Sequence, residues 1–72
     1  MSAAQLPAML KALREQRRMT RLTLSIRAGV SEDAIRSFEK GKGLPSAEVL
    51  ARLAAALGAD VGALAAPPKE AA

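Results

Sequence analysis

The amino-acid sequence predicts a small all-α domain in which five short helices pack around one core. Apolar residues recur three and four positions apart in several segments, as they do in amphipathic helices. Ser, Thr, Asp and Gly stand at the ends of these segments, where helices are usually capped. No segment alternates apolar and polar residues as a half-buried strand does, and 72 residues suffice for one domain only.

The first helix is expected from Pro7 to Arg17, because proline suits a first turn, where its missing N–H is not needed. Apolar residues recur along this segment at helical spacing and predict the side that faces the core. They are Leu6, Met9, Leu10 and Leu13.

A second, short helix is expected after Thr20, whose hydroxyl can cap it. Its apolar side consists of Leu24 and Ala28. Gly29 ends this helix, because glycine readily adopts the left-handed conformation that a tight turn demands.

A third helix is expected after the capping residue Ser31. Glu32 and Asp33 stand in its first turn, where negative charge suits the helix dipole. Its inward side consists of Ala34, Ile35 and Phe38.

Residues 41–45 have the composition of a loop, and a fourth helix is expected between its cap Ser46 and Gly58. The apolar stripe of this helix consists of Val49, Leu50, Leu53, Ala54 and Leu57.

The end of the chain is expected to hold a fifth, short helix that is capped by Asp60 and contains Val61 and Leu64. Residues 67–72 have little to bury and are expected to form a flexible C-terminal tail, so the domain is assigned to residues 1–66.

Composition excludes several classes of site. The chain contains no Cys and no His, which excludes a disulfide scaffold, a Cys/His zinc site and a catalytic thiolate or imidazole. One Phe without Trp or Tyr gives no aromatic surface for stacking single-stranded bases. No phosphate-binding loop, dinucleotide motif, secretory signal or membrane-spanning apolar run is present. We therefore expect a cytoplasmic protein without enzymatic activity, cofactor, metal or membrane partner.

Positive charge is concentrated in the first part of the chain. The formal net charge is +4, and residues 1–31 contain six basic residues against one acidic residue. Residues 32–72 contain five basic and six acidic residues. This asymmetry favours a negatively charged partner, although a solvated helix face rich in arginine would have the same composition.

Two short helices joined by Ala28-Gly29-Val30-Ser31 have the form of a helix-turn-helix, whose second helix usually lies in the major groove of DNA. Further features stand in order along the chain: Leu10-Lys11-Ala12-Leu13-Arg14, Met19-Thr20-Arg21, Ile35, Phe38-Glu39-Lys40-Gly41-Lys42, Pro45-Ser46, and Leu50 through Leu57-Gly58. With this set the chain resembles the phage-repressor and Cro-type (lambda-repressor-like, XRE) family of helix-turn-helix domains from about Leu6 to Leu64.

The resemblance implies a compact lambda-repressor-like fold and double-stranded DNA as the partner. It also implies a small transcriptional regulator, a repressor or autoregulator, whose recognition helix spans about Ser31 to Lys40. A single domain contacts few base pairs, so we expect a homodimer on a two-fold operator. As in many relatives, the last helix around Val61 and Leu64 is expected to form the dimer contact.

The resemblance also assigns roles to individual residues. Arg14 and Glu39 match a partly buried ion pair between the first helix and the end of the third, and both stand next to the apolar side of their helices. Arg21 matches a position that contacts a DNA phosphate. The other expected phosphate contacts are Lys40 and Lys42. Arg17, Arg18 and Arg27 are further candidates for neutralising phosphates.

The positions that face base edges in the family correspond to Glu32, Asp33 and Ser37, with Arg36 near them. Carboxylates can accept a hydrogen bond from the cytosine amino group, but Glu32 and Asp33 also stabilise the helix N-terminus, and we favour that role. Arg36 can bind guanine through two hydrogen bonds or pair with Glu32 four residues earlier, and both interpretations stay open.

Leu22 and Ile26 depart from the family pattern, in which these positions are usually polar. They either pack at the junction with the first helix, which we favour, or form a small apolar patch that binds a protein partner. The second interpretation leads to an alternative function, a protein-interaction module or an antitoxin-type regulator.

Overall fold

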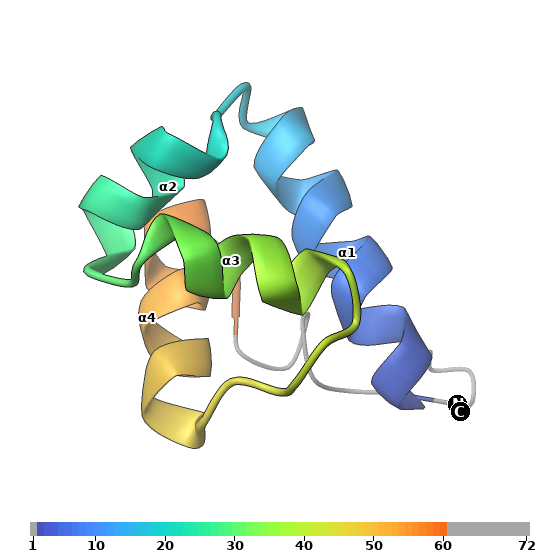
Figure 1. Ribbon diagram of the computed structural model, residues 1–72. Helices are drawn as coiled ribbons and strands as arrows, with labels where there is room; N and C mark the ends of the chain where they lie inside the picture. The colour runs from blue at the N-terminus through green and yellow to red at the C-terminus, as the bar shows by residue number, and fades with distance from the viewer. Residues whose placement is uncertain (1, 61–72) are drawn as a thin grey trace.

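The computed structural model describes residues 2–60, and the side chains from residue 6 onward. These residues form four α-helices and no strand (Figure 1). The all-α class is confirmed, whereas the fifth helix around Val61 and Leu64 and the tail over 67–72 lie outside the described residues. The four helices are α1 (Ser2–Gln16), α2 (Arg21–Ala28), α3 (Glu32–Glu39) and α4 (Ala47–Leu57).

The expected start of the first helix is wrong, because α1 begins at Ser2 and Pro7 lies inside it. Proline there removes one backbone hydrogen bond, and helical structure continues on both sides. The proline ring lies beside the loop that follows α3: a Cβ atom on Gly41 would stand 3.7 Å from Cγ of Pro7. The helix also ends at Gln16 rather than Arg17.

Three of the four predicted N-terminal caps are present, and the fourth, Asp60, was assigned to the helix that lies outside the described residues. Each hydroxyl oxygen accepts a hydrogen bond from the backbone N–H three residues later, which satisfies a donor that the helix itself leaves unpaired. The pairs are Thr20 with Thr23 at 3.0 Å, Ser31 with Ala34 at 3.1 Å, and Ser46 with Val49 at 3.2 Å.

The C-terminal end of α1 differs from those of α2 and α4, which end at glycines with positive φ. After α1 the left-handed position is occupied by Arg18, with φ of +58°. The following N–H, that of Met19, donates to the carbonyl oxygen of Arg14 at 3.1 Å, as is usual after a left-handed cap. A residue with a side chain thus takes a conformation that glycine adopts at lower cost.

The core lies between all four helices. α3 packs against α1 and α2, and α2 also packs against α4. Met9, expected in the apolar stripe of α1, is 39% exposed instead, because it lies beside the row formed by Leu6, Leu10 and the partly buried Leu13. The buried apolar residues are Leu6, Leu10, Leu24, Ala28, Val30, Ile35, Leu53, Ala54 and Leu57.

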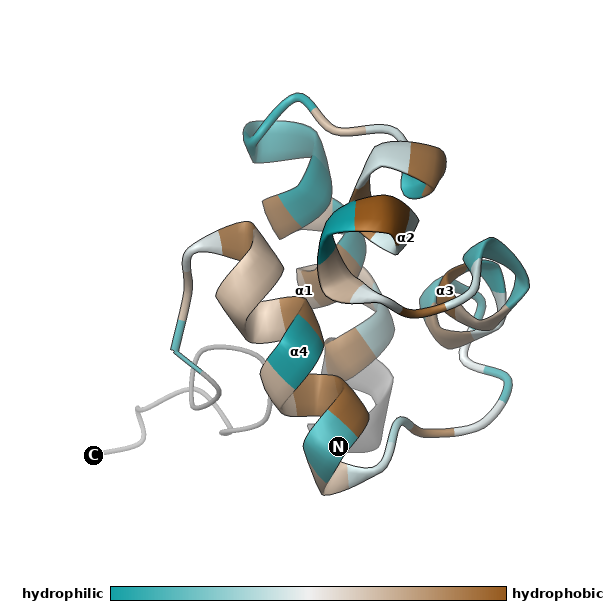
Figure 2. Cartoon of the chain, turned by 90° about the vertical axis from the view of Figure 1, so that its left-hand side faces the viewer, coloured by the Kyte–Doolittle hydropathy of each residue, from teal (hydrophilic) through white to brown (hydrophobic). Residues whose placement is uncertain are grey.

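The helix α3 has an apolar side and a hydrophilic side. Figure 2 shows this helix nearly end-on, with apolar positions toward the other helices and hydrophilic positions on the outer side. Ile35 is fully buried, whereas Asp33 has an exposed side chain.

No helix in the described part of the chain combines the length and the apolar character that a membrane span requires.

Candidate nucleic-acid interface

The geometry of the α2–α3 pair is fixed by the short turn between them. Gly29 has φ of +70°, and a Cβ atom there would lie 3.2 Å from Nη1 of Arg52 on α4. Val30, the next residue, is buried and anchors the turn in the core. The left-handed Gly29 and the buried Val30 therefore set the path of the chain between the two helices.

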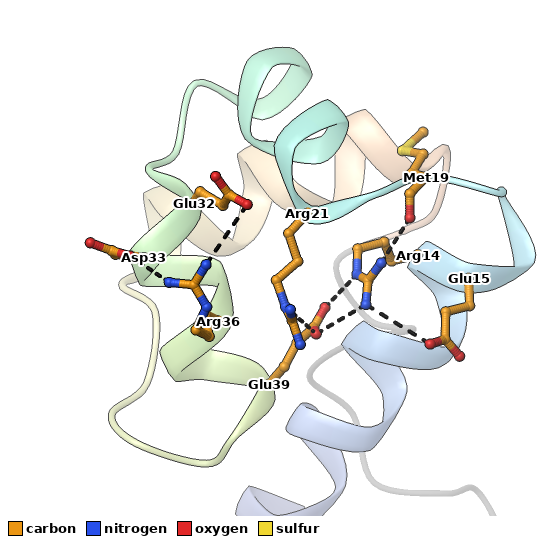
Figure 3. A network of polar contacts seen from close by, with 8 residues as sticks. All are labelled: Arg14, Glu15, Met19, Arg21, Glu32, Asp33, Arg36 and Glu39. Carbon is orange, nitrogen blue, oxygen red and sulfur yellow. Dashed lines mark hydrogen bonds and ion pairs between the residues drawn. The ribbon is translucent and has the colours of Figure 1, made fainter.

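A buried ion pair ties α1 to the end of α3 (Figure 3). Nε and Nη2 of Arg14 donate to the two carboxylate oxygens of Glu39 at 2.7 and 3.2 Å. Nη1 of Arg14 donates to the carbonyl oxygen of Met19 at 2.8 Å. The hydrogen bond with Glu39 raises the pKa of Arg14 above its ordinary value, although burial acts in the opposite direction. This is the pair that the family resemblance implied.

Arg21 joins the same carboxylate. Its Nε donates to Oε1 of Glu39 at 3.0 Å, and its side chain is 33% exposed. The sequence assigned Arg21 to a DNA phosphate and gave Glu39 only one partner, so this contact was missed. Arg21 and Glu39 stand 18 residues apart in the sequence, and no sequence signal links them. One carboxylate therefore holds two guanidinium groups, and the cluster of three side chains carries one net positive charge.

Three of the four residues expected at or near base edges lie in contact along α3, because Arg36 pairs with Glu32 and Asp33 one turn earlier. Nη1 of Arg36 lies 2.5 Å from Oδ1 of Asp33, and its Nη2 lies 3.8 Å from Oε2 of Glu32. The closer partner is thus the residue three positions earlier, not the expected one four positions earlier. Ser37 is partly buried, and its carbonyl oxygen accepts a hydrogen bond from the N–H of Lys42 at 2.8 Å.

The other basic residues expected at phosphates have different surroundings. Arg18 and Arg27 are exposed, and so are Lys40 and Lys42 beyond the end of α3. Arg17 is exposed as well, but its Nε donates to the carbonyl oxygen of Leu57 at 2.8 Å. It therefore satisfies a carbonyl at the C-terminus of α4, a structural contact that the sequence did not predict.

Leu22 and Ile26 do not pack at the junction with α1, and that expectation is wrong. Their exposed fractions are 55% and 73%, because both lie on the outer side of α2 while Leu24 and Ala28 face the core. Met19, which stands near them in the sequence, is partly buried and packs against the core instead.

Residues 5–67 match the family model of a helix-turn-helix domain. The chain belongs to this helix-turn-helix family. The match spans all of the described interface, from α1 to the residues beyond α4. Within the part of the chain that the structure describes, no three or more acidic side chains gather into a group that could hold a metal ion.

The fold of this helix-turn-helix domain is similar to that of a solved structure, the hypothetical transcription factor NHTF from Neisseria. The TM-score is 0.87 at 21% sequence identity, and the alignment covers 99% of this chain and 82% of that chain. At this identity the similarity concerns the fold. A search of curated proteins finds no match.

Proposed function

We propose that this helix-turn-helix domain binds double-stranded DNA sequence-specifically and acts as a small transcriptional regulator, a repressor or autoregulator. The observation that carries the proposal is that α3 has one buried side and one exposed side. Ile35 fixes one side in the core and Glu39 ties its end to α1, while Asp33 and Arg36 remain on the surface. A helix held in this way can enter the major groove without rearranging the domain. A regulator of this kind would act where the DNA is, in the cytoplasm.

Basic residues around α3 would bind the phosphates and set the orientation of the domain on the duplex. Lys40 and Lys42 follow α3 directly and are exposed. Arg21 would contribute through the nitrogens that do not contact Glu39, since only its Nε makes that hydrogen bond. The other proposed phosphate contacts are Arg18, Arg27 and Arg17, the last at the expense of its bond to α4.

The proposal includes a homodimer. A recognition helix of eight residues contacts few base pairs, so useful specificity requires two copies on a two-fold operator with half-sites about one helical turn apart. We place the dimer contact in the C-terminal segment around Val61 and Leu64.

A selection from a randomised duplex pool at low salt, followed by binding of the selected sequences near physiological salt, tests the proposal. The expected result is a palindromic consensus that retains its affinity at the higher salt concentration. Selection of no consensus, or affinity that disappears with added salt, would leave only non-specific electrostatic attraction and contradict the proposal.

The exposed pair Leu22 and Ile26 supports a second candidate function, in which the domain binds a protein partner. Isolated exposed apolar side chains are common, but these two stand four residues apart on one helix and share its outer side. An antitoxin-type regulator would combine both functions, binding a toxin through α2 and its operator through α3. A partner that loses affinity when this pair is replaced, while DNA binding persists, would support it.

A further inference from the structure

The acidic tip of α3 holds its one arginine in place. Within α3, whose residues are all described, Arg36 is the only basic residue. Its guanidinium lies between the carboxylates of Asp33 and Glu32, one helical turn toward the N-terminus (Figure 3). Long side chains on helices lean in this direction in any case, so the two carboxylates reinforce an orientation that the helix already favours.

The contacts leave most of the guanidinium free to donate. Arginine has five N–H groups, and Nη1 uses one of them on Asp33, while the 3.8 Å contact between Nη2 and Glu32 is longer than a hydrogen bond. The Arg36 side chain is 40% exposed, so these donors are accessible to a ligand. Asp33 is 92% exposed and contacts Arg36 through one oxygen, Oδ1, so Oδ2 remains as an acceptor.

The net charge of this cluster disfavours contact with phosphates but not with base edges. Glu32, Asp33 and Arg36 together carry one net negative charge at neutral pH, which disfavours approach of a phosphate to the helix tip. A base edge is neutral and has no such penalty. Guanine is the base that offers two acceptors in the major groove, O6 and N7, at the spacing of two guanidinium N–H groups.

We propose that Arg36, oriented by Asp33 and Glu32, selects guanine in each half-site of the target DNA. The free oxygen of Asp33 accepts a hydrogen bond from an exocyclic amino group on a neighbouring base pair, that of cytosine or adenine. The carboxylates are positioning residues for Arg36, and they also weaken binding to DNA of other sequences. This inference rests on the proposed function, because it names the base that the proposed interface selects.

The test compares duplex selection by the wild-type chain with selection by Arg36→Lys. Lysine keeps the charge but lacks the planar pair of donors, so the salt dependence should stay the same. One guanine position per half-site should lose its preference, by about 5- to 150-fold in relative affinity. Arg52→Lys is the control, since Arg52 also pairs with an acidic residue one turn earlier on its own helix, Glu48 on α4, and its replacement should leave every preference unchanged.

Asp33→Asn tests the positioning role separately, with Glu48→Gln as the matched loss of one negative charge. The expected result is weaker discrimination at the guanine position together with tighter binding to unrelated duplexes. If both variants raise affinity for all duplexes alike, Asp33 acts through charge only and its positioning role is wrong. Circular dichroism of each variant checks that these exposed substitutions leave the fold intact.

The outcomes separate this inference from the proposed function. A consensus without guanine, or one that Arg36→Lys leaves unchanged, overturns the role of Arg36 while sequence-specific binding stands. Failure of the wild-type chain to select any consensus overturns both. A guanine position that is lost in Arg36→Lys and kept in Arg52→Lys supports the inference.

Discussion

Glu39 accepts hydrogen bonds from two nitrogens of Arg14, at 2.7 and 3.2 Å, and its side chain is only 2% exposed. The pair joins residues 25 positions apart in the sequence and closes α1 against the end of α3. Since both partners are buried, removing one leaves the other charge without compensation in a poorly solvated place.

We therefore expect Glu39→Ala to lower the free energy of unfolding by about 3 kcal/mol, which is most of the stability of so small a domain. Glu39→Gln keeps one acceptor for Arg14 and should cost less, about 1–2 kcal/mol. The matched control is Glu48→Ala, since the Glu48–Arg52 pair is 75% and 51% exposed and should contribute at most about 0.5 kcal/mol. Urea unfolding followed by circular dichroism gives the three values, and similar losses for Glu39→Ala and the control would contradict the prediction.

The left-handed residue after α1 offers a stabilising substitution. Arg18 is exposed and has φ of +58°, a conformation that costs a residue with a side chain about 1 kcal/mol relative to glycine. Arg18→Gly should therefore raise the free energy of unfolding above that of Arg18→Ala by about 1 kcal/mol, even though glycine is more flexible in the unfolded chain. Both variants lose the same charge, so their difference in thermal unfolding isolates the backbone. A glycine variant no more stable than the alanine variant would show that the conformation costs nothing here.

Arg17 and Lys42 should differ in their contributions to stability. Arg17→Ala removes the 2.8 Å hydrogen bond to the carbonyl oxygen of Leu57 and should lower stability by about 1 kcal/mol. Lys42→Ala removes an exposed charge beyond α3, so it should leave stability unchanged, weaken binding to all duplexes alike and reduce the salt slope by about one. Urea unfolding and duplex binding at several salt concentrations measure the two effects. Wild-type stability of Arg17→Ala would contradict the structural role of its bond to Leu57, whereas a smaller salt slope for this variant would support the proposed phosphate contact.

The exposed apolar pair on α2 should be dispensable for folding. Leu22→Glu combined with Ile26→Lys should change the free energy of unfolding by less than about 0.5 kcal/mol, because neither side chain is in the core. If DNA affinity and sedimentation also stay the same, the pair belongs to a partner other than DNA or a second copy. Leu24→Ala on the same helix is the control, since Leu24 is fully buried and its truncation should cost about 2–5 kcal/mol. A large loss in the double variant would mean that the pair supports the fold.

Local signals in the sequence determined the middle of the fold well. The caps Thr20, Ser31 and Ser46 and the glycines 29 and 58 place the boundaries of α2, α3 and α4, because each acts on backbone groups within a few residues. The start of α1 was placed too late because proline favours a first turn but is also accommodated inside a helix whose other residues remain bonded.

Only the tertiary structure decided how the charged side chains are used. Arg21 turns to Glu39 and Arg17 to the end of α4, contacts across 18 and 40 residues that no local pattern encodes. The periodicity of α2 likewise identified Leu24 and Ala28 as its inward side, but packing decided that Leu22 and Ile26 stay outside. Capping hydrogen bonds at a helix end depend on neighbouring residues in the sequence alone. The partner of a long flexible side chain depends on which helices the fold brings together.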